Sequence, residues 1–427
     1  MSSIVLFSIL LALMLTGMPI SISLGLTVLT FLFTMTQVPL ESVALKLFSG
    51  IEKFEIMAIP FFILAGNFLT HGGVARRMIN FATSLVGHWY GGLALSGVMA
   101  CALFAAVSGS SPATVVAIGS ILIPGMVKAG FPMRFGAGVI TTSGALGILI
   151  PPSIVMVMYA IATNTSVGSL FMAGVIPGIV LASMLGGITW YRARKYNYPR
   201  QPKASWSERF RAFRESAWGL MLIIVVMGGI YTGIFTPTEA AAMSAVYSFF
   251  VAVFIYKDMG LKDVPKVLLN SANMSAMLLY IITNAVMFSF ILANENIPQE
   301  LTNWMIEMGF GQIAFLLAVN VLLLMAGNFM EPSSIMLIFA PIVFPVAMKL
   351  GIDPIHLGVI MVVNMEVGMC HPPVGLNLYV ASGITKMGIT ELTIAVWPWL
   401  LTMIVFLVIV TYWPTLSIWL PKMLGMM

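Results

Sequence analysis

Apolar stretches of about 20 residues, the length that crosses a bilayer as a helix, recur along the whole chain. The alternation of polar and apolar positions over about 10 residues that is typical of a transmembrane β-strand is missing from the sequence. The pattern therefore predicts an all-α polytopic membrane protein with about eleven transmembrane helices. The expected apolar segments cover residues 4–17, 19–36, 56–70, 131–149, 154–164, 170–191, 216–234, 239–256, 272–293, 356–367, 374–385 and 392–415.

Two further apolar stretches, 92–124 and 312–349, are too long for one span. Polar residues and a proline interrupt each of them, with the sequence VSGSSPATV in the first and GNFMEPSSI in the second. Each pattern predicts a re-entrant hairpin, in which two half-helices meet at a polar tip. The stretch 41–55 differs, because charged and apolar residues alternate along it, and we expect a helix that lies on the membrane surface.

The second half of the chain repeats part of the first half. The pairs Pro151–Pro152 and Pro372–Pro373 lie 221 positions apart, and Gly147 and Gly368 share that offset. The offset is nearly constant from residue 112 to residue 168. Adjacent prolines break a helix, because each lacks an N–H group and clashes with the preceding turn. Each half is therefore predicted to contain a hairpin followed by a broken helix.

The charges predict how the two halves are oriented. The densest basic stretch covers residues 192–214, and the positive-inside rule places it in the cytoplasm. When the spans are counted from this loop, the first hairpin enters from inside and the second from outside. The repeats are then inverted, and both termini lie in the periplasm. Inverted repeats with broken helices are the architecture of secondary transporters, which hold substrate and ions near the membrane midplane.

Composition agrees with a membrane protein and argues against other classes. Of the 427 residues, 60% are hydrophobic and 8% are charged, whereas soluble domains carry roughly 25% charged residues. The net charge of +5 comes from loops that set topology, so we expect no nucleic-acid partner. Two cysteines are too few for a disulfide framework.

An enzyme is disfavoured, because the sequence has neither a paired metal-binding motif nor a nucleophile–base pair. A channel is disfavoured, because polar residues cluster at four breaks.

These patterns divide the chain into five regions. The predicted regions are N-terminal scaffold helices with a surface helix (1–90), a first transport repeat (91–170), scaffold helices with a basic cytoplasmic loop at 192–215 (171–310), a second transport repeat (311–390) and a C-terminal helix (391–427).

The two hairpin tips and the two Pro-Pro breaks are the expected functional sites. Irregular backbone at membrane depth is tolerated only where protein or a water-filled cavity satisfies its polar groups. The carbonyl ends of half-helices suit a small cation such as Na⁺, and the N–H ends suit a carboxylate. For the glycines and serines, close helix packing is the alternative role. The candidate Na⁺ ligands are Ser108, Gly109, Ser110, Ser111, Ser143, Gly144, Gly147 and Pro151 in the first repeat, and Gly327, Asn328, Glu331, Asn364, Gly368, Met369 and Pro372 in the second.

The candidate substrate contacts lie around the two Pro-Pro breaks and are His371, Glu366, Pro152, Pro373 and Asn377. Ionisable groups at membrane depth are functional by default, which singles out Glu366 and His371. Glu366 is predicted to bind a cation or a proton, or to serve as a structural hydrogen-bond partner. His371 replaces an isoleucine of the first repeat, and its alternatives are a substrate contact and a helix-capping group.

Several motifs together resemble one known transporter family across essentially the whole chain. They are IPFFILAGNFLTHGGVARR (59–77), SGSSPATVVAIGSILIPGM (108–126), PPSIVMVMYA (151–160), GIFTPTEAAA (233–242) and HPPVGLNLYVASGITK (371–386). The sequence resembles the large membrane subunit of the tripartite ATP-independent periplasmic (TRAP) transporters. The last motif, with GNFMEPSS before it, most resembles members that carry C4-dicarboxylates such as succinate, fumarate and malate.

The resemblance implies uptake across the bacterial inner membrane that is driven by Na⁺ rather than by ATP. It implies two protein partners, a periplasmic substrate-binding protein and a small four-helix membrane subunit. It also implies an elevator mechanism, in which the hairpins and broken helices move against a scaffold within the lipid bilayer. The alternatives are a family member for sialic acid or another carboxylate, and a stand-alone Na⁺- or H⁺-coupled anion symporter.

Overall fold

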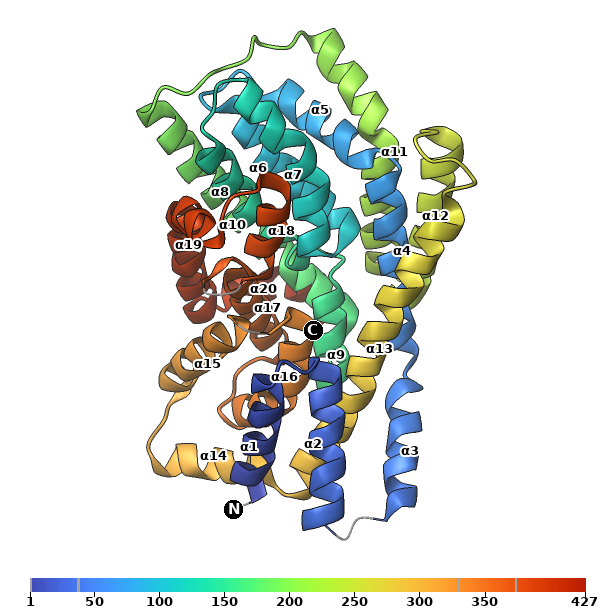
Figure 1. The fold of residues 1–427 in the computed structure, drawn as a ribbon, viewed down its shortest axis with the longest axis vertical. Coiled ribbons are helices and arrows are strands. Elements are labelled where there is room, and N and C mark those ends of the chain that lie inside the picture. Colours follow the sequence, from blue (N-terminus) through green and yellow to red (C-terminus); the bar gives the residue numbers. More distant parts are fainter. Residues whose placement is uncertain (1, 37–38, 329, 373–374) are drawn as a thin grey trace.

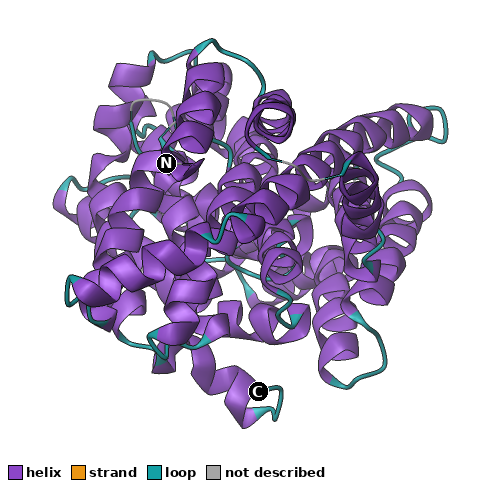
Figure 2. Cartoon of the chain, turned by 90° about the horizontal axis from the view of Figure 1, so that it is seen from below, coloured by secondary structure: helices purple, strands orange, loops and turns teal. Residues whose placement is uncertain are grey.

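The fold is entirely helical over the residues that the computed structural model describes, which are 2–36, 39–328, 330–372 and 375–427. Figure 1 shows the arrangement of the helices, and Figure 2 shows from below that every regular element of these ranges is a helix. Eight of the described helices are long and apolar enough to cross a membrane. The prediction of an all-α polytopic membrane protein is confirmed.

The first repeat is a helical hairpin followed by a broken helix, as predicted. The hairpin ends its first helix at Gly109, whose φ of 62° is a left-handed conformation that glycine adopts without strain. A proline in the first turn of the second helix costs little, because that N–H group has no partner within the helix. The elements are α6 (Gly92–Ser108), α7 (Ser111–Lys128), α8 (Met133–Ser143), the 3₁₀ helix η2 (Gly144–Ile148) and α9 (Ile154–Thr163).

The second repeat also consists of a hairpin followed by a broken helix, and its hairpin lies at the opposite end of the molecule. Figure 1 shows the first hairpin in the upper half of the molecule and the second in the lower half. The backbone breaks at the positions that the prolines predicted, and the structure describes this break except for residues 373–374. The elements are α15 (Gln312–Gly327), α16 (Pro332–Lys349), α17 (Pro354–Cys370) and α18 (Leu376–Thr385).

The remaining helices surround the two repeats. Before the first repeat come α1 (Ser2–Leu15), α2 (Ile20–Met35), α3 (Leu40–Ile51), η1 (Phe54–Met57), α4 (Ala58–His71) and α5 (Val74–Val86). Between the repeats lie α10 (Val167–Lys195), α11 (Trp206–Tyr231), α12 (Pro237–Phe250), the π-helix η3 (Val251–Ile255), α13 (Val264–Asn294) and α14 (Ile297–Glu307). The chain ends with α19 (Ile389–Tyr412) and α20 (Thr415–Met423).

The helix α3 packs along α13, and the place of residues 41–55 on a membrane surface stays a prediction. The Lys46 ammonium lies 5.6 Å from the centre of the Phe290 ring. One turn further along α3, a Cβ atom built on Gly50 would lie 2.5 Å from a methyl carbon of Val286. Residue numbers rise along α3 as they fall along α13, so the two helices pack lengthwise and antiparallel, side by side in Figure 1. An amphipathic pattern suits a partner helix as well as a membrane surface.

A polar contact joins this scaffold segment to the first repeat. Lys53, between α3 and η1, donates hydrogen bonds from Nζ to the Ile161 carbonyl at 2.9 Å and to Asn164 Oδ1 at 2.7 Å. Asn164 ends α9 in a left-handed conformation, with φ of 54°. A cation at a helix C-terminus satisfies carbonyls that have no partner within the helix. The contact therefore stabilises the end of α9 and fixes it to the scaffold.

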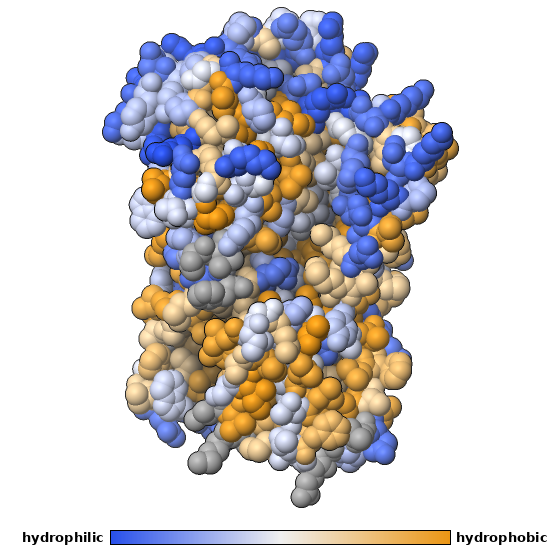
Figure 3. Space-filling view, viewed as in Figure 1, coloured by the Kyte–Doolittle hydropathy of each residue, from blue (hydrophilic) through white to orange (hydrophobic). Residues whose placement is uncertain are grey.

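The surface separates into a polar end and broad apolar flanks. In Figure 3, hydrophilic residues gather at the top, over α5 and the start of α11, whereas hydrophobic residues cover much of the surface below. Large apolar side chains remain exposed on it, such as Phe33 at 69%, Leu45 at 70% and Ile234 at 70%. Surface of this kind is costly in water but not in hydrocarbon, which agrees with a multi-pass membrane protein.

Candidate functional site

Each hairpin tip packs directly on the broken helix of its own repeat through glycine. A Cβ atom built on Gly147 would lie 2.6 Å from the carbonyl oxygen of Ser110. One built on Gly368 would lie 2.9 Å from the Cα atom of Gly327. The two backbones approach closely at equivalent positions of the repeat, and a side chain has no room at either place. The structure thus brings together the tip and break residues that the sequence predicted to meet.

The first tip is held by hydroxyl groups. Ser108 Oγ lies 3.0 Å from Thr114 Oγ1, which donates to the Ser110 carbonyl at 2.8 Å. A Cβ atom on Gly109 would lie 2.8 Å from the Pro152 carbonyl oxygen, so this tip also touches the break at its prolines. Sequence reasoning missed the role of Thr114, although a hydroxyl in the first turn after the tip was a signal. Two further predicted residues of this break, Gly144 and Pro151, are also buried.

At one equivalent position, each repeat buries an oxygen atom that lacks a hydrogen-bond partner among the described residues. These atoms are Ser143 Oγ and Asn364 Oδ1, and the two residues are 221 positions apart. Asn364 Nδ2 donates to Asn320 Oδ1 at 2.8 Å, and Asn320 Nδ2 donates to Thr411 Oγ1 at 2.9 Å, which fixes the amide. A buried acceptor without a partner costs about 1–3 kcal/mol. Hard cations take such oxygens as ligands, so the atoms fit the predicted Na⁺ sites.

Asn320 was not among the predicted residues. Its signal was its place as the one amide side chain inside the apolar stretch 312–327, apart from Gln312 at the start. Polar side chains inside membrane helices pair with one another, so an asparagine in such a stretch indicates a partner on a neighbouring helix.

The four half-helices that begin at the tips and breaks differ in how their N-termini are satisfied. Ser153 caps α9 by accepting from the Met156 N–H group at 3.3 Å. Glu331 caps α16, accepting from the Ser334 N–H group at 3.3 Å and from the Ser333 hydroxyl at 2.6 Å. The helices α7 and α18 have no side-chain cap. Their free N–H groups suit a carboxylate ligand, whereas α16 already carries a carboxylate of its own. A Na⁺-binding role for Glu331 stays a prediction.

The two uncapped helices meet across the repeats. Asn377 Nδ2 donates to Ser111 Oγ at 2.8 Å, and Ser111 Oγ lies 3.1 Å from Asn377 Oδ1. The same amide donates to the Thr141 carbonyl at 3.3 Å. Ser111 begins α7 and Asn377 lies in the first turn of α18, so the first tip contacts the second break. The contact joins a predicted Na⁺ ligand and a predicted substrate residue in one place.

The second break holds the other ionisable candidates. His371 Nδ1 bonds Asn328 Oδ1 at 2.7 Å, which joins this break to the second tip. Glu366 is fully buried, and neither carboxylate oxygen has a partner among the described residues. Pro373 lies outside the described residues. Two further candidates of this break are the buried Met369 and the half-buried Pro372.

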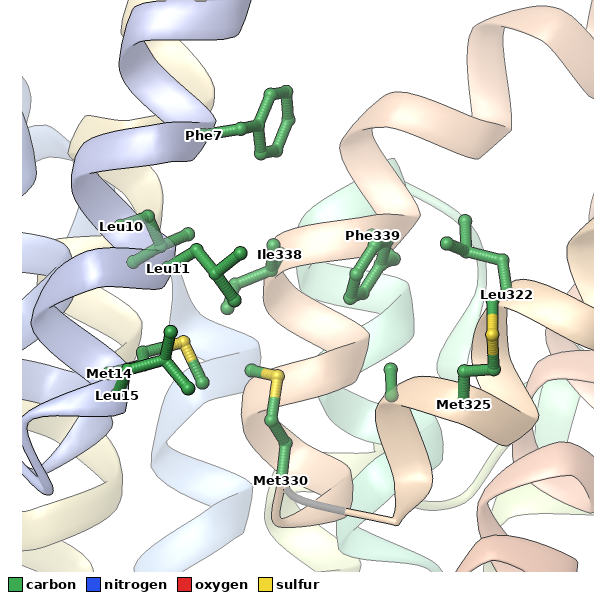
Figure 4. Close-up of a pocket in the computed structure, with 11 residues that line it drawn as sticks. Phe7, Leu10, Leu11, Met14, Leu15, Leu322, Met325, Met330, Ile338 and Phe339 are labelled. Atoms are coloured by element: carbon green, nitrogen blue, oxygen red, sulfur yellow. The ribbon is translucent and has the colours of Figure 1, made fainter.

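A large cavity nearby is not the site of this chemistry. It has a volume of about 600 Å³ and lies between α1 and the second hairpin. Figure 4 shows apolar side chains around it, including Leu10 and Leu11 of α1 and Phe339 of α16. The lining side chains offer no charged or hydrogen-bonding group, so the cavity is suited to neither a carboxylate nor Na⁺.

The sequence matches a family model described as "Tripartite ATP-independent periplasmic transporter, DctM component" over residues 7–416. The chain belongs to this family. It is 74% identical to the C4-dicarboxylate TRAP transporter large permease protein DctM of Rhodobacter capsulatus over 100% of both chains. It is 55% identical to the DctM protein of Pseudomonas aeruginosa over 95% of both. It is 35% identical to the sialic acid TRAP transporter large permease protein SiaM of Vibrio cholerae over 97% of both.

A solved structure shares the fold. The YdaH transporter of Alcanivorax borkumensis superposes with a TM-score of 0.62, covering 90% of this chain and 88% of that one, at 16% identity. At this identity the likeness concerns the fold alone. The resemblance to TRAP large membrane subunits, inferred from the motifs, is confirmed, and the chain is a multi-pass membrane subunit of a tripartite transporter.

Proposed function

We propose that this chain is the large membrane subunit of a Na⁺-coupled importer of C4-dicarboxylates such as succinate, fumarate and malate. Three relatives support the substrate class, since proteins named as C4-dicarboxylate permeases are 74%, 55% and 51% identical to it. The relative named for sialic acid is 35% identical, so similarity favours the dicarboxylate over the sialic acid alternative.

The observation that carries the proposal for Na⁺ is the matched pair of buried, unpartnered oxygens, Ser143 Oγ and Asn364 Oδ1. Each lies on the helix that packs on a tip, within about one turn of Gly147 or Gly368. A cation at either oxygen would remove the cost of the missing hydrogen bond and draw the tip backbone toward the break. Binding would thereby order the tips.

The substrate site is proposed between the uncapped N-termini of α7 and α18. One carboxylate of the substrate would accept hydrogen bonds from their free N–H groups, beside Ser111 and Asn377. His371, which the first repeat lacks, supplies an imidazole for selection of the second carboxylate. Because Na⁺ would order the first tip, and that tip forms part of the anion site, each ligand would raise the affinity for the other.

The transport cycle is proposed to move the two repeats against the surrounding helices in the inner membrane, as an elevator. A periplasmic binding protein would deliver the substrate, and a small four-helix membrane subunit would complete the scaffold. The basic loop 192–215 would lie in the cytoplasm and both termini in the periplasm, since the distribution of Lys and Arg favours this orientation.

Reconstitution tests this proposal directly. The chain is placed in liposomes with its small subunit and binding protein, and uptake of labelled succinate and labelled sialic acid is followed under an inward Na⁺ gradient. We expect succinate uptake that requires all three proteins and the gradient. Uptake of sialic acid without uptake of succinate would indicate a sialic acid permease instead. Succinate uptake by this chain alone would favour a stand-alone symporter.

A further inference from the structure

A hollow at the polar end of the molecule combines aromatic rings with arginine. It has a volume of about 370 Å³ and is lined by His88, Trp89, Tyr90, Trp190 and Arg200. The first three residues lie between α5 and α6, Trp190 lies near the end of α10, and Arg200 lies on the chain that follows α10. That chain crosses the top of the molecule in Figure 1. The hollow therefore lies where the long apolar helix α10 becomes a basic loop.

The hollow is a fixed part of the fold. The Gln201 N–H group donates to the Gly87 carbonyl at 3.0 Å, which ties the basic loop to the turn before α6. A Cβ atom on Gly91 would lie 2.3 Å from the Cβ atom of Ala193, so the start of α6 touches α10. These contacts hold the two sides of the hollow together without help from a ligand.

The arginines at the hollow are oriented by aromatic rings. The Arg200 guanidinium lies 3.7 Å from the centre of the Tyr90 ring, and its Nη2 donates to the Tyr90 hydroxyl at 3.0 Å. The Arg194 guanidinium lies 5.4 Å from the centre of the Trp190 ring. Stacking of this kind orders a guanidinium in advance and leaves further N–H donors for a phosphate. Trp89 and Trp190 remain 51% and 37% exposed.

His88 adds an unsatisfied donor. Trp89 Nε1 donates to His88 Nε2 at 3.1 Å, and an indole N–H only donates, so the proton of the neutral imidazole is on Nδ1. Nδ1 is buried and has no acceptor among the described residues. His88 therefore contributes to the hollow as the hydrogen-bond partner that orients the Trp89 indole.

The basic residues near the hollow are not balanced by acidic residues of the described chain. Residues 56–207 include nine Lys and Arg residues and no Asp or Glu. Three of the nine pair with acids from elsewhere in the chain, namely Arg76, Arg77 and Arg134. Five others lie in the last turn of α10 or on the chain that follows it and make no ion pair within the described chain: Arg192, Arg194, Lys195, Arg200 and Lys203. A cluster of this kind beside a membrane helix attracts anionic lipid, and Trp and Tyr prefer the headgroup level.

We propose that this hollow binds the phosphate headgroup of an anionic phospholipid, with Arg194 and Arg200 at the phosphate and the two tryptophans at the headgroup level. The position on α10, at the end of a span, favours a lipid over a soluble anion. Since the hollow joins α10 to the start of the first hairpin, a bound lipid would also brace the root of that hairpin.

The test compares two lipids on the full chain. Purified protein is placed in nanodiscs of phosphatidylcholine, and phosphatidylglycerol with the same acyl chains is added in steps while the unfolding temperature is followed. We expect the temperature to rise with phosphatidylglycerol. The variant R194Q/R200Q should require at least about tenfold more of it for the same rise. Lys128→Gln, which removes an exposed charge outside the hollow, should behave as the unchanged protein.

Several outcomes would overturn the proposal. One is an equal response of R194Q/R200Q and the unchanged protein, and another is an equal loss in Lys128→Gln, which would show a general charge effect. Inorganic phosphate or an acidic peptide that produced the same rise would indicate a soluble ligand. If R194Q/R200Q does not fold, Arg200→Lys keeps the charge but loses the planar fork. Native mass spectrometry should then find less phosphatidylglycerol retained on Arg200→Lys, and equal retention would refute the site.

Discussion

The two repeats share a backbone arrangement but differ in the side chains at their tips. Gly147 and Gly368 occupy equivalent positions, and each packs on the tip of its own hairpin. At the tips the equivalent residues are Ser111 and Glu331, which are 220 positions apart. Ser111 reaches the other repeat through Asn377, whereas Glu331 caps its own helix. The common part is suited to binding similar cations in both halves, and the difference would confine the proposed anion site to one side.

The largest expected effect concerns the glycine contacts between tip and break that both repeats share. Gly147→Ala places a methyl group 2.6 Å from a backbone oxygen, so the first tip must move. Overpacking of this size costs about 1–3 kcal/mol, and we expect Na⁺-driven uptake to fall at least about tenfold. Gly368→Ala should do the same in the second repeat. Gly125→Ala on α7, with no atom within 4 Å of the new methyl group, is the control. A loss of uptake in only one of the two variants would show that the two glycine contacts are not equivalent.

The second-largest expected effect concerns the buried oxygens that are proposed to bind Na⁺. Ser143→Ala removes an oxygen that has no partner among the described residues, so folding should be little changed while one proposed Na⁺ ligand is lost. We expect the Na⁺ concentration for half-maximal uptake to rise about tenfold, the equivalent of ~1.4 kcal/mol. Thr142→Val, which removes a hydroxyl that donates to the Gly138 carbonyl of its own helix at 2.8 Å, is the matched control. Unchanged Na⁺ dependence in Ser143→Ala would remove this oxygen from the ion site.

The smallest effect sharpens the difference between the tips. Ser111→Ala loses the bond to Asn377, and the loss of about 1 kcal/mol should raise the KM for succinate roughly fivefold at saturating Na⁺. Glu331→Gln keeps an acceptor for the Ser334 N–H group and should leave this KM nearly unchanged. If Glu331→Gln raised the KM more than Ser111→Ala, the anion site would belong to the second tip instead.

Sequence alone predicted the parts of the fold that depend on local signals. Prolines and glycines marked both hairpins and both breaks, because their backbone limits act within a few residues. The repeat offset also predicted that Gly147 and Gly368 are equivalent. The bond between Ser111 and Asn377 was not predicted, since it joins residues that come together only through the packing of opposite halves. The packing of α3 on α13 was not predicted, because an amphipathic pattern alone does not say which partner covers its apolar face.

The two hydrogen bonds of Lys53 would affect how often the first repeat moves relative to the scaffold. Its ammonium joins the scaffold to the last turn of α9 through Ile161 and Asn164. A displacement of the first repeat by one helical turn, about 5.4 Å, would carry both oxygen atoms out of reach of Nζ. Each such displacement must therefore exchange two hydrogen bonds for water. The contact would thus stabilise the present arrangement against the movement proposed above.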